Sequence, residues 1–152
     1  MNTLKAGDSA PSFSLQNQDD ETVNLSDYSG QTVVVYFYPK AMTPGCTVQA
    51  QGLRDSNQAL KDKGAVVFGI SPDPVARLRK FADKENLNFT LLSDPDHKVA
   101  EDFGVWGLKK FMGKEYDGIH RITFIIDKHG KVSQVLNKFK TKEHHQTLLD
   151  AL

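Results

Sequence analysis

The stretch YFYPKAMTPGCT, residues 36–47, holds the only cysteine of the chain and the sharpest change of local pattern. It continues VVV at residues 33–35, and these β-branched and aromatic residues predict a strand buried on both faces, as in a parallel sheet. Pro39 ends this strand. Thr43 can then cap a helix whose first residue is Pro44, where a missing N–H has no cost. The stretch therefore predicts a strand that leads into a helix.

Cys46 falls at the third position of this predicted helix. A sulfur there lies close to unpaired backbone N–H groups and to the positive end of the helix dipole, and both favour a thiolate over a thiol. We therefore expect a large thiolate fraction at neutral pH. A lone cysteine can also be a small buried hydrophobic residue, but its Thr-Pro-Gly setting at a strand-to-helix turn favours chemistry.

The composition sets limits on the class of protein. The 152 residues suit a single domain, 1–152, with its own core. Nineteen basic and 19 acidic residues cancel without long runs of either sign, so we expect no nucleic-acid or membrane partner. One cysteine excludes an intramolecular disulfide framework and a multi-cysteine metal site. No apolar leader or spanning segment is evident, which predicts a cytoplasmic location.

The order of patterns predicts an α/β fold with a mixed central sheet flanked by helices. An N-terminal β-hairpin, built from alternating residues near 13–15 and 23–25, precedes the central strand. The first helix runs to about Lys63, and a second buried strand at 65–70 completes a parallel crossover unit. Four further elements are predicted: a helix opened by Asp73-Pro74, a strand at 89–92, a short helix opened by Asp94-Pro95 and closed by Gly104, and a final helix carrying Leu148, Leu149 and Leu152.

Between the short helix and the final one, periodicity fades at 104–118, which predicts a long loop. A strand at 119–126, a turn at 127–130 and an antiparallel partner at 131–139 follow. Arg121 then projects from a mostly apolar strand face, which is unusual for a cation without a partner. The alternative is an edge-strand arginine whose head reaches water.

The residues around the cysteine resemble a known family. Pro39-x-x-x-Thr43-x-x-Cys46 resembles the peroxidatic signature of the peroxiredoxins, and residues 36–47 resemble more narrowly the bacterioferritin comigratory protein or peroxiredoxin Q subfamily. The resemblance extends over nearly the whole chain, through LLSD at 91–94, FGVWG at 103–107 and GIHR at 118–121. It implies a thioredoxin-like fold with an added N-terminal hairpin.

The resemblance also implies roles for individual residues. Cys46 would be the nucleophile of a thiol-dependent peroxidase that reduces hydrogen peroxide and organic hydroperoxides and becomes a sulfenic acid. Arg121 would hold the thiolate and the peroxide oxygens, because a guanidinium stays charged and offers a planar fork of donors. Thr43 and the N–H groups near Gly45 would bind the peroxide, while Pro39 would shield the sulfur from water. No metal, haem or flavin cofactor is expected.

The chain departs from the subfamily where a second, resolving cysteine is common. Gln51 stands five residues after Cys46, and Ala82 stands at the alternative position on the next helix. We therefore expect an external thiol such as thioredoxin, glutaredoxin or glutathione to reduce the sulfenic acid. The resemblance favours a monomer. The competing interpretation is a thioredoxin-like redox-sensing or thiol-binding protein that forms mixed disulfides through Cys46.

Other candidate groups are weak. The histidines lack ligand spacing, and we expect them to be solvated; they are His97, His120, His129, His144 and His145. Trp106 and Phe111 are interpreted as packing residues that could also wall the peroxide pocket.

Overall fold

The computed structural model describes residues 1–152. The strands are β1 (Ser14–Asn17), β2 (Thr22–Asn24), β3 (Thr32–Phe37), β4 (Ala65–Ser71), β5 (Thr90–Ser93), β6 (Trp106–Phe111), β7 (Lys114–Ile119), β8 (Thr123–Ile126) and β9 (Val132–Leu136). The helices are α1 (Pro44–Asp62), α2 (Val75–Glu85), α3 (Lys98–Phe103) and α4 (His144–Ala151), with 3₁₀ turns η1 (Leu25–Tyr28) and η2 (Thr141–Glu143).

Seven strands form one mixed sheet in the order β2-β1-β5-β4-β3-β8-β9. β3, α1 and β4 make the predicted parallel crossover, and β3 pairs antiparallel with β8 on its other side. The hairpin of β1 and β2 extends the sheet at one edge. The predicted α/β class, mixed sheet and N-terminal hairpin are therefore confirmed.

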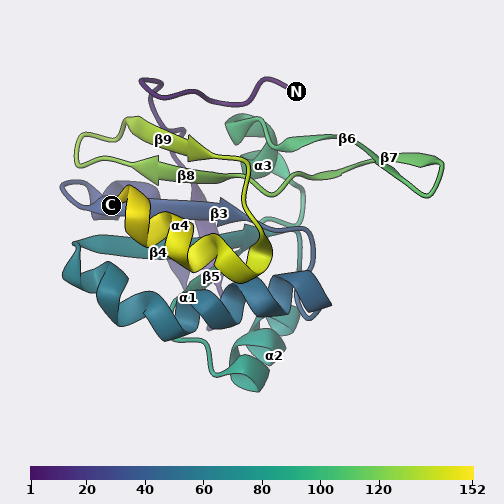
Figure 1. The fold of residues 1–152 in the computed structure, drawn as a ribbon, viewed down its shortest axis with the longest axis horizontal. Coiled ribbons are helices and arrows are strands. Elements are labelled where there is room, and N and C mark those ends of the chain that lie inside the picture. Colours follow the sequence, from purple (N-terminus) through teal and green to yellow (C-terminus); the bar gives the residue numbers. More distant parts are fainter.

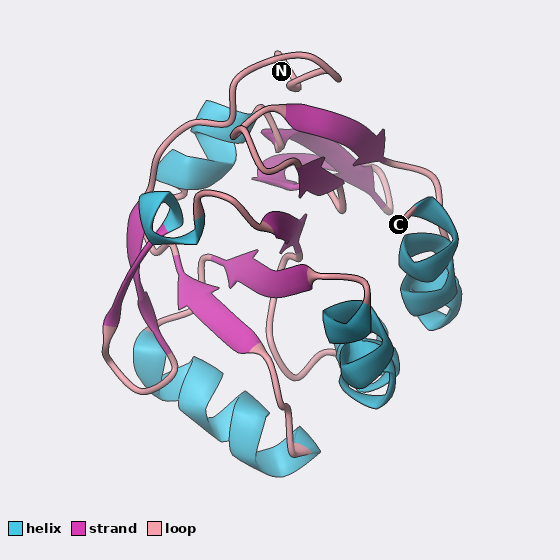
Figure 2. Cartoon of the chain, turned by 90° about the vertical axis from the view of Figure 1, so that its left-hand side faces the viewer, coloured by secondary structure: helices cyan, strands magenta, loops and turns pink.

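Helices cover both faces of this sheet (Figures 1 and 2). Side chains alternate along β3, so that Val34 and Tyr36 point into one core cluster, and Val35 and Phe37 into the other. The first cluster contains buried residues of α1, α2 and α4, and the second those of α3. Burying an apolar side chain of this size contributes about 1.5–3 kcal/mol, so these side chains anchor β3 to the cores on both faces of the sheet. No helix combines the length and apolar character needed to cross a bilayer.

The loop predicted at 104–118 is wrong, because this segment forms the β6–β7 hairpin (Figure 1). The hairpin pairs only with itself and projects from the body of the molecule. Much of both its faces is exposed, so its sequence lacks the alternation that marks a half-buried strand. Its turn places Met112 at φ 52° and Gly113 at φ 78°, and methionine is not a usual residue for such a turn.

Two predicted helix starts are also displaced. α2 begins at Val75 and α3 at Lys98, later than Asp73-Pro74 and Asp94-Pro95 imply. The Asp94 carboxylate still reaches α3, where it accepts hydrogen bonds from the N–H groups of Val99 and Ala100 at 3.2 and 3.0 Å. The Asp73 carboxylate turns instead toward the loop after β3.

Candidate active site

The turn from β3 into α1 forms as predicted. Thr43 occupies the N-cap position, Pro44 is the first helical residue, and Cys46 is the third. The Thr43 hydroxyl does not cap the helix, however, because it donates to the carbonyl oxygen of Lys40 at 2.8 Å. The N–H groups of Gly45 and Cys46 lie in the first turn, where a helix offers them no internal acceptor.

The loop before α1 is held by residues of β4 and α2. The Asp73 carboxylate accepts hydrogen bonds from the N–H of Ala41 at 2.7 Å and from the Ser71 hydroxyl at 2.8 Å. Arg77 donates to the carbonyl oxygen of Ala41 at 2.7 Å and pairs with Asp73 at 3.2 Å. Both peptide groups of Ala41 are thus fixed, next to Met42 at φ 65°. An aspartate before a proline predicts a helix cap, and nothing in the local sequence indicates this contact with Ala41.

Arg121 lies against the cysteine. Its Nη2 donates to the Cys46 Sγ over 3.1 Å. Cys46 is 2% exposed, so the contact between guanidinium and sulfur is largely shielded from water, where attraction between opposite charges is stronger than at the surface. The structure therefore brings together the two residues on which the sequence argument depends most.

The strand predicted at 119–126 is interrupted at Arg121. Ile119 pairs with Trp106 in the hairpin, whereas Thr123 pairs with Tyr36 in the main sheet. The chain must pass from one sheet to the other between these residues, and Arg121 lies in that passage. The contact between Arg121 and Cys46 therefore arises from this passage and not from the predicted strand face.

Gly45 makes room for this guanidinium. A Cβ built on Gly45 would lie 3.1 Å from the Arg121 Nη2 and 3.9 Å from its Cζ. A side chain at this position would press on the cation that contacts Cys46. The glycine therefore contributes space as well as a backbone N–H to the start of α1.

A chain of buried polar side chains continues from Arg121. Its Nη1 donates to the Gln49 Oε1 at 2.9 Å, and the Gln49 Nε2 lies 3.1 Å from the His144 Nδ1. The His144 Nε2 lies 2.8 Å from the Thr123 hydroxyl. Gln49 is not among the predicted site residues, although it lies three residues after Cys46 and residues three apart on a helix share a face. The expectation of a solvated His144 is wrong, since it is 0% exposed.

Burial changes the proton affinities of groups around the site. It lowers the pKa of His144 to about 3, and the neighbouring His145 and Arg121 act in the same direction. Burial is also the largest cause of the raised pKa values of Tyr36 and Tyr38, whose rings stack at 5.4 Å. Burial, and then the nearby Arg121 cation, lower the pKa of Lys109. The imidazole and both phenols are therefore neutral at physiological pH.

The remaining predicted positions surround these residues. Pro39 is half-buried just beyond the end of β3. Gln51 donates from its Nε2 to the Glu85 Oε1 at 2.8 Å, which ties α1 to α2. Ala82 is buried in the core. No three histidine, cysteine, aspartate or glutamate side chains come together in a group suited to a metal ion.

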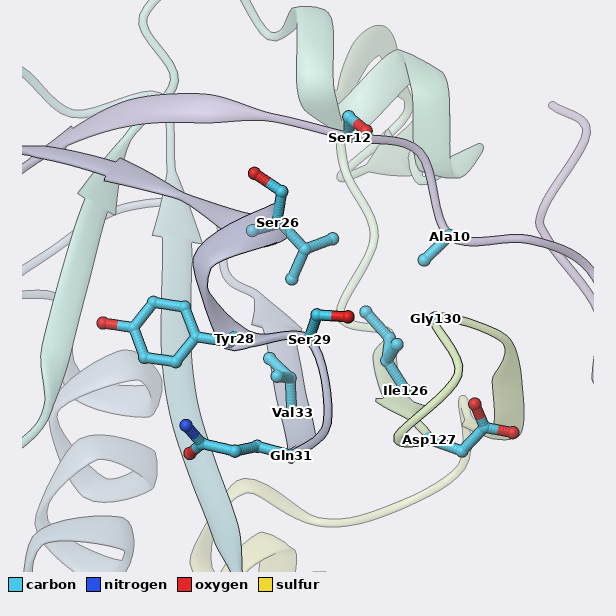
Figure 3. A pocket seen from close by; sticks show the side chains of 11 residues that line it. Ala10, Ser12, Ser26, Tyr28, Ser29, Gln31, Val33, Ile126, Asp127 and Gly130 are labelled. Carbon is cyan, nitrogen blue, oxygen red and sulfur yellow. The ribbon is translucent and has the colours of Figure 1, made fainter.

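None of the cavities is lined by Cys46 or Arg121. One cavity of about 130 Å³ lies near the opposite end of β3, between Val33, Tyr28 and Ile126 (Figure 3). No cavity therefore opens onto Cys46, which is itself only 2% exposed.

Comparisons with known proteins place the chain among characterised families and folds. A family model described as AhpC/TSA family matches residues 6–135. Peroxiredoxin Bcp of Escherichia coli (strain K12) is 64% identical over 152 residues, covering 100% of this chain and 97% of that protein. The crystal structure of peroxidoxin BcpB from Mycobacterium tuberculosis has a TM-score of 0.85 at 37% identity, covering 97% of this chain and 95% of the other. The Xanthomonas campestris bacterioferritin comigratory protein, described for its alkyl peroxide reduction activity, has a TM-score of 0.86 at 32% identity over 91% and 88% of the two chains.

Proposed function

The chain belongs to the AhpC/TSA family and is a peroxiredoxin, a thiol-dependent peroxidase with a thioredoxin-like fold; from this premise we propose that Cys46 is its peroxidatic nucleophile and that Arg121 holds its thiolate. The observation that carries the proposal is the distance of 3.1 Å between the Arg121 Nη2 and the Cys46 Sγ. A fixed cation at this distance stabilises the ionised sulfur, and the first turn of α1 adds the positive end of its dipole.

The proposed reaction is a displacement at oxygen. The Cys46 thiolate attacks one oxygen of ROOH, an S–O bond forms while the O–O bond breaks, and the leaving RO⁻ takes up a proton as alcohol or water. Cys46 becomes a sulfenic acid. Negative charge thus moves from sulfur to the leaving oxygen during the step. Donors already in place around that oxygen lower the barrier without reorganising, as in an oxyanion hole.

Three kinds of donor are available for this charge. Arg121 presents the Nη2 that contacts the sulfur. The N–H groups of Gly45 and Cys46 belong to the first turn of α1, which offers them no internal acceptor. The Thr43 hydroxyl, which donates to Lys40 in this structure, can rotate toward a bound peroxide oxygen. Pro39 is proposed to cover the sulfur from the strand side and to limit its contact with water.

The proposed substrates are hydrogen peroxide and organic hydroperoxides. Cys46 is 2% exposed and no cavity opens onto it, so only the small O–O group has to reach the sulfur while the rest of a larger hydroperoxide stays outside. The Xanthomonas campestris relative is described for alkyl peroxide reduction, which supports organic hydroperoxides as substrates here.

The proposed reductant is an external thiol, because the chain has one cysteine. Gln51 and Ala82 occupy the two positions where relatives of this subfamily carry a resolving cysteine, so the sulfenic acid has no internal partner. Thioredoxin, glutaredoxin and glutathione are the candidate donors. The chain is proposed to act as a monomeric single domain, 1–152, in the cytoplasm.

The test is stopped-flow oxidation of the reduced protein by hydrogen peroxide, with trapping of the sulfenic acid by dimedone. Wild type is expected to react far faster than free cysteine. Cys46→Ser should abolish the reaction, and Arg121→Ala should slow it by roughly 10²–10³-fold, the usual effect of removing one transition-state donor. A wild type no faster than free cysteine, or an Arg121→Ala variant as fast as wild type, would contradict the proposal.

A further inference from the structure

His144 is the first residue of α4, which packs against α1 (Figure 1). Its ring is fully buried and lies between two aromatic neighbours, stacked on Phe139 at 4.4 Å and tilted against Tyr36 at 5.6 Å. The imidazole is therefore held in one orientation by packing, and both of its nitrogens meet polar side chains. The reaction described above makes no use of this residue.

The hydrogen-bonded side chains that lead from Arg121 through Gln49 and His144 to Thr123 have one possible order of donors and acceptors. The Arg121 guanidinium determines this order. A guanidinium has only donors, so the Gln49 atom that faces Arg121 at 2.9 Å must be its amide oxygen. The amide nitrogen of Gln49 then faces the His144 Nδ1 at 3.1 Å and can only donate. The Nδ1 must accept, so the imidazole carries its single proton on Nε2 and donates it to the Thr123 hydroxyl at 2.8 Å.

This order of donors and acceptors also fixes the orientation of the Gln49 side-chain amide. An amide can turn over and exchange its oxygen and nitrogen, and in Gln49 that exchange would place an NH₂ group against the Arg121 guanidinium. It would also place an oxygen against the unprotonated Nδ1 of His144, so two acceptors would meet in a buried site, where unmade hydrogen bonds are costly. The neutral Nε2–H form of His144 therefore opposes the flip.

We propose that His144 is a positioning residue for the peroxidase reaction: its Nδ1 holds the Gln49 amide with the oxygen toward Arg121, and this fixes the guanidinium plane against the Cys46 sulfur. The proposal rests on the proposed function and assigns a role to a residue that touches neither sulfur nor substrate. One Arg121 nitrogen meets the sulfur and another meets Gln49. If the contact with Gln49 is lost, the guanidinium is free to rotate and its contact with the Cys46 sulfur is no longer held in one orientation.

Two substitutions separate the role of Nδ1 from that of Nε2. In His144→Asn the amide oxygen is attached to Cγ, as Nδ1 is in histidine, so it can still accept from Gln49. In His144→Gln the polar group lies one bond farther out, near the place of Nε2, so it can reach Thr123 and not Gln49. His145→Asn is the matched control, because His145 is the same residue type one position along α4 and makes no hydrogen bond to this chain of side chains.

The first readout is the rate at which hydrogen peroxide oxidises Cys46, followed by stopped flow. Trapping with dimedone identifies the product as the sulfenic acid. We expect His144→Gln to slow the oxidation about 10- to 50-fold, less than the roughly 10²–10³-fold loss for removing a transition-state donor outright. The rate of His144→Asn should fall no more than about threefold below wild type. Asn keeps an acceptor at the Nδ1 position, so this variant should react faster than His144→Gln. In a Gln49→Leu background the difference between the two variants should disappear, as expected when Gln49 carries the coupling.

The second readout does not depend on activity. Two-bond ¹H–¹⁵N spectra of the wild-type imidazoles should show His144 as the neutral Nε2–H form at neutral pH. An Nδ1–H form would overturn the proposal, as would equal rates for His144→Asn and His144→Gln, or a difference that persists without Gln49. A wild type unable to form the sulfenic acid would refute the proposed function instead, and the imidazole spectrum would still decide the order of the hydrogen bonds.

Discussion

Asp73 and Ala41 lie 32 positions apart in the sequence, and the Asp73 carboxylate accepts a hydrogen bond from the Ala41 N–H over 2.7 Å. This contact ties the loop before α1 to the segment between β4 and α2. The loop determines where Thr43 and Cys46 stand, so its position affects the reacting geometry as well as stability.

Asp73→Ala should therefore lower both stability and rate. The Ala41 N–H would lose its acceptor in a buried site, which costs about 1–3 kcal/mol, and the Tm should fall by roughly 2–4 °C for each kcal/mol. Sulfenic acid formation should slow as well, because the loop loses its anchor. Thermal unfolding and stopped flow measure the two effects, with the exposed Asp96→Ala as control. A rate equal to wild type would show that the loop keeps its place without Asp73.

Gly45→Ala should separate stability from activity. Alanine is the better helix former by about 1 kcal/mol, so the thermal stability of the variant should be equal to wild type or higher. The new Cβ would lie 3.1 Å from the Arg121 Nη2, which is the movable end of a long side chain and should shift away from the sulfur. We expect about a tenfold slower reaction with peroxide, since a small displacement of a preorganised group has effects of this size.

The result that would contradict this reading of Gly45 is an unchanged rate. Arg121 would then accommodate the methyl group without leaving the sulfur, and the glycine would matter for its backbone alone. A crystal structure of the variant would show the position of the guanidinium directly.

The part of the fold that sequence could predict is the part with strong local signals. The buried run before Pro39 and the Thr-Pro pair place β3 and the start of α1 within a residue, and Cys46 follows as the third helical residue. The hairpin at β6 and β7 could not be predicted in the same way, because much of both its faces meets water and no alternation results.

The site shows the same division. Cys46 and Thr43 follow from the local pattern, whereas the positions of Gln49, Asp73 and His144 depend on which helices pack together. A polar sequence context predicts a solvated histidine. His144 is buried only because α4 packs against α1 and β3. Arg121 could be selected as a candidate, but its contact with the sulfur results from the passage between two sheets.

The buried His144 should make stability depend on pH. Its pKa is about 3 in the folded protein, lowered first by burial and then by His145 and Arg121, against about 6.5 when unfolded. The phenol of Tyr36, which packs against it, stays neutral. Below pH 6.5 the His144 imidazole binds a proton in the unfolded state but not in the folded state. The free energy of unfolding therefore falls as pH falls toward 3. The slope from this group is about 1.4 kcal/mol per pH unit.

The measurement is chemical unfolding between pH 7.5 and 4.5 for wild type and His144→Leu. The variant should be less stable at pH 7.5 but should lose less stability on acidification, so that the two curves converge. Asp94 acts in the opposite sense, since burial raises its pKa, but its effect is common to both proteins and cancels in the difference. Parallel curves would show that His144 is protonated in the folded state, contrary to its buried setting.

Gln51→Cys should restore an internal route for the sulfenic acid only if α1 unwinds. Residues five apart in an ideal helix have Cα atoms about 8.7 Å apart, beyond the roughly 7 Å that a disulfide can bridge. In this chain Gln51 also ties α1 to Glu85 at 2.8 Å. Under excess peroxide without thiol, wild type should therefore advance to the sulfinic acid, while Gln51→Cys should form a disulfide and lose helical signal in circular dichroism.

Gln51→Ser is the matched control, because it removes the contact with Glu85 and offers no second sulfur. It should accumulate sulfinic acid as wild type does, as measured by intact mass after timed exposure to peroxide. If Gln51→Cys reaches the sulfinic state as fast as Gln51→Ser, the start of α1 does not open within the lifetime of the sulfenic acid. Reduction by an external thiol must then occur with Cys46 still in its folded position beside Arg121, so that the thiol has to approach a sulfur that is 2% exposed at rest.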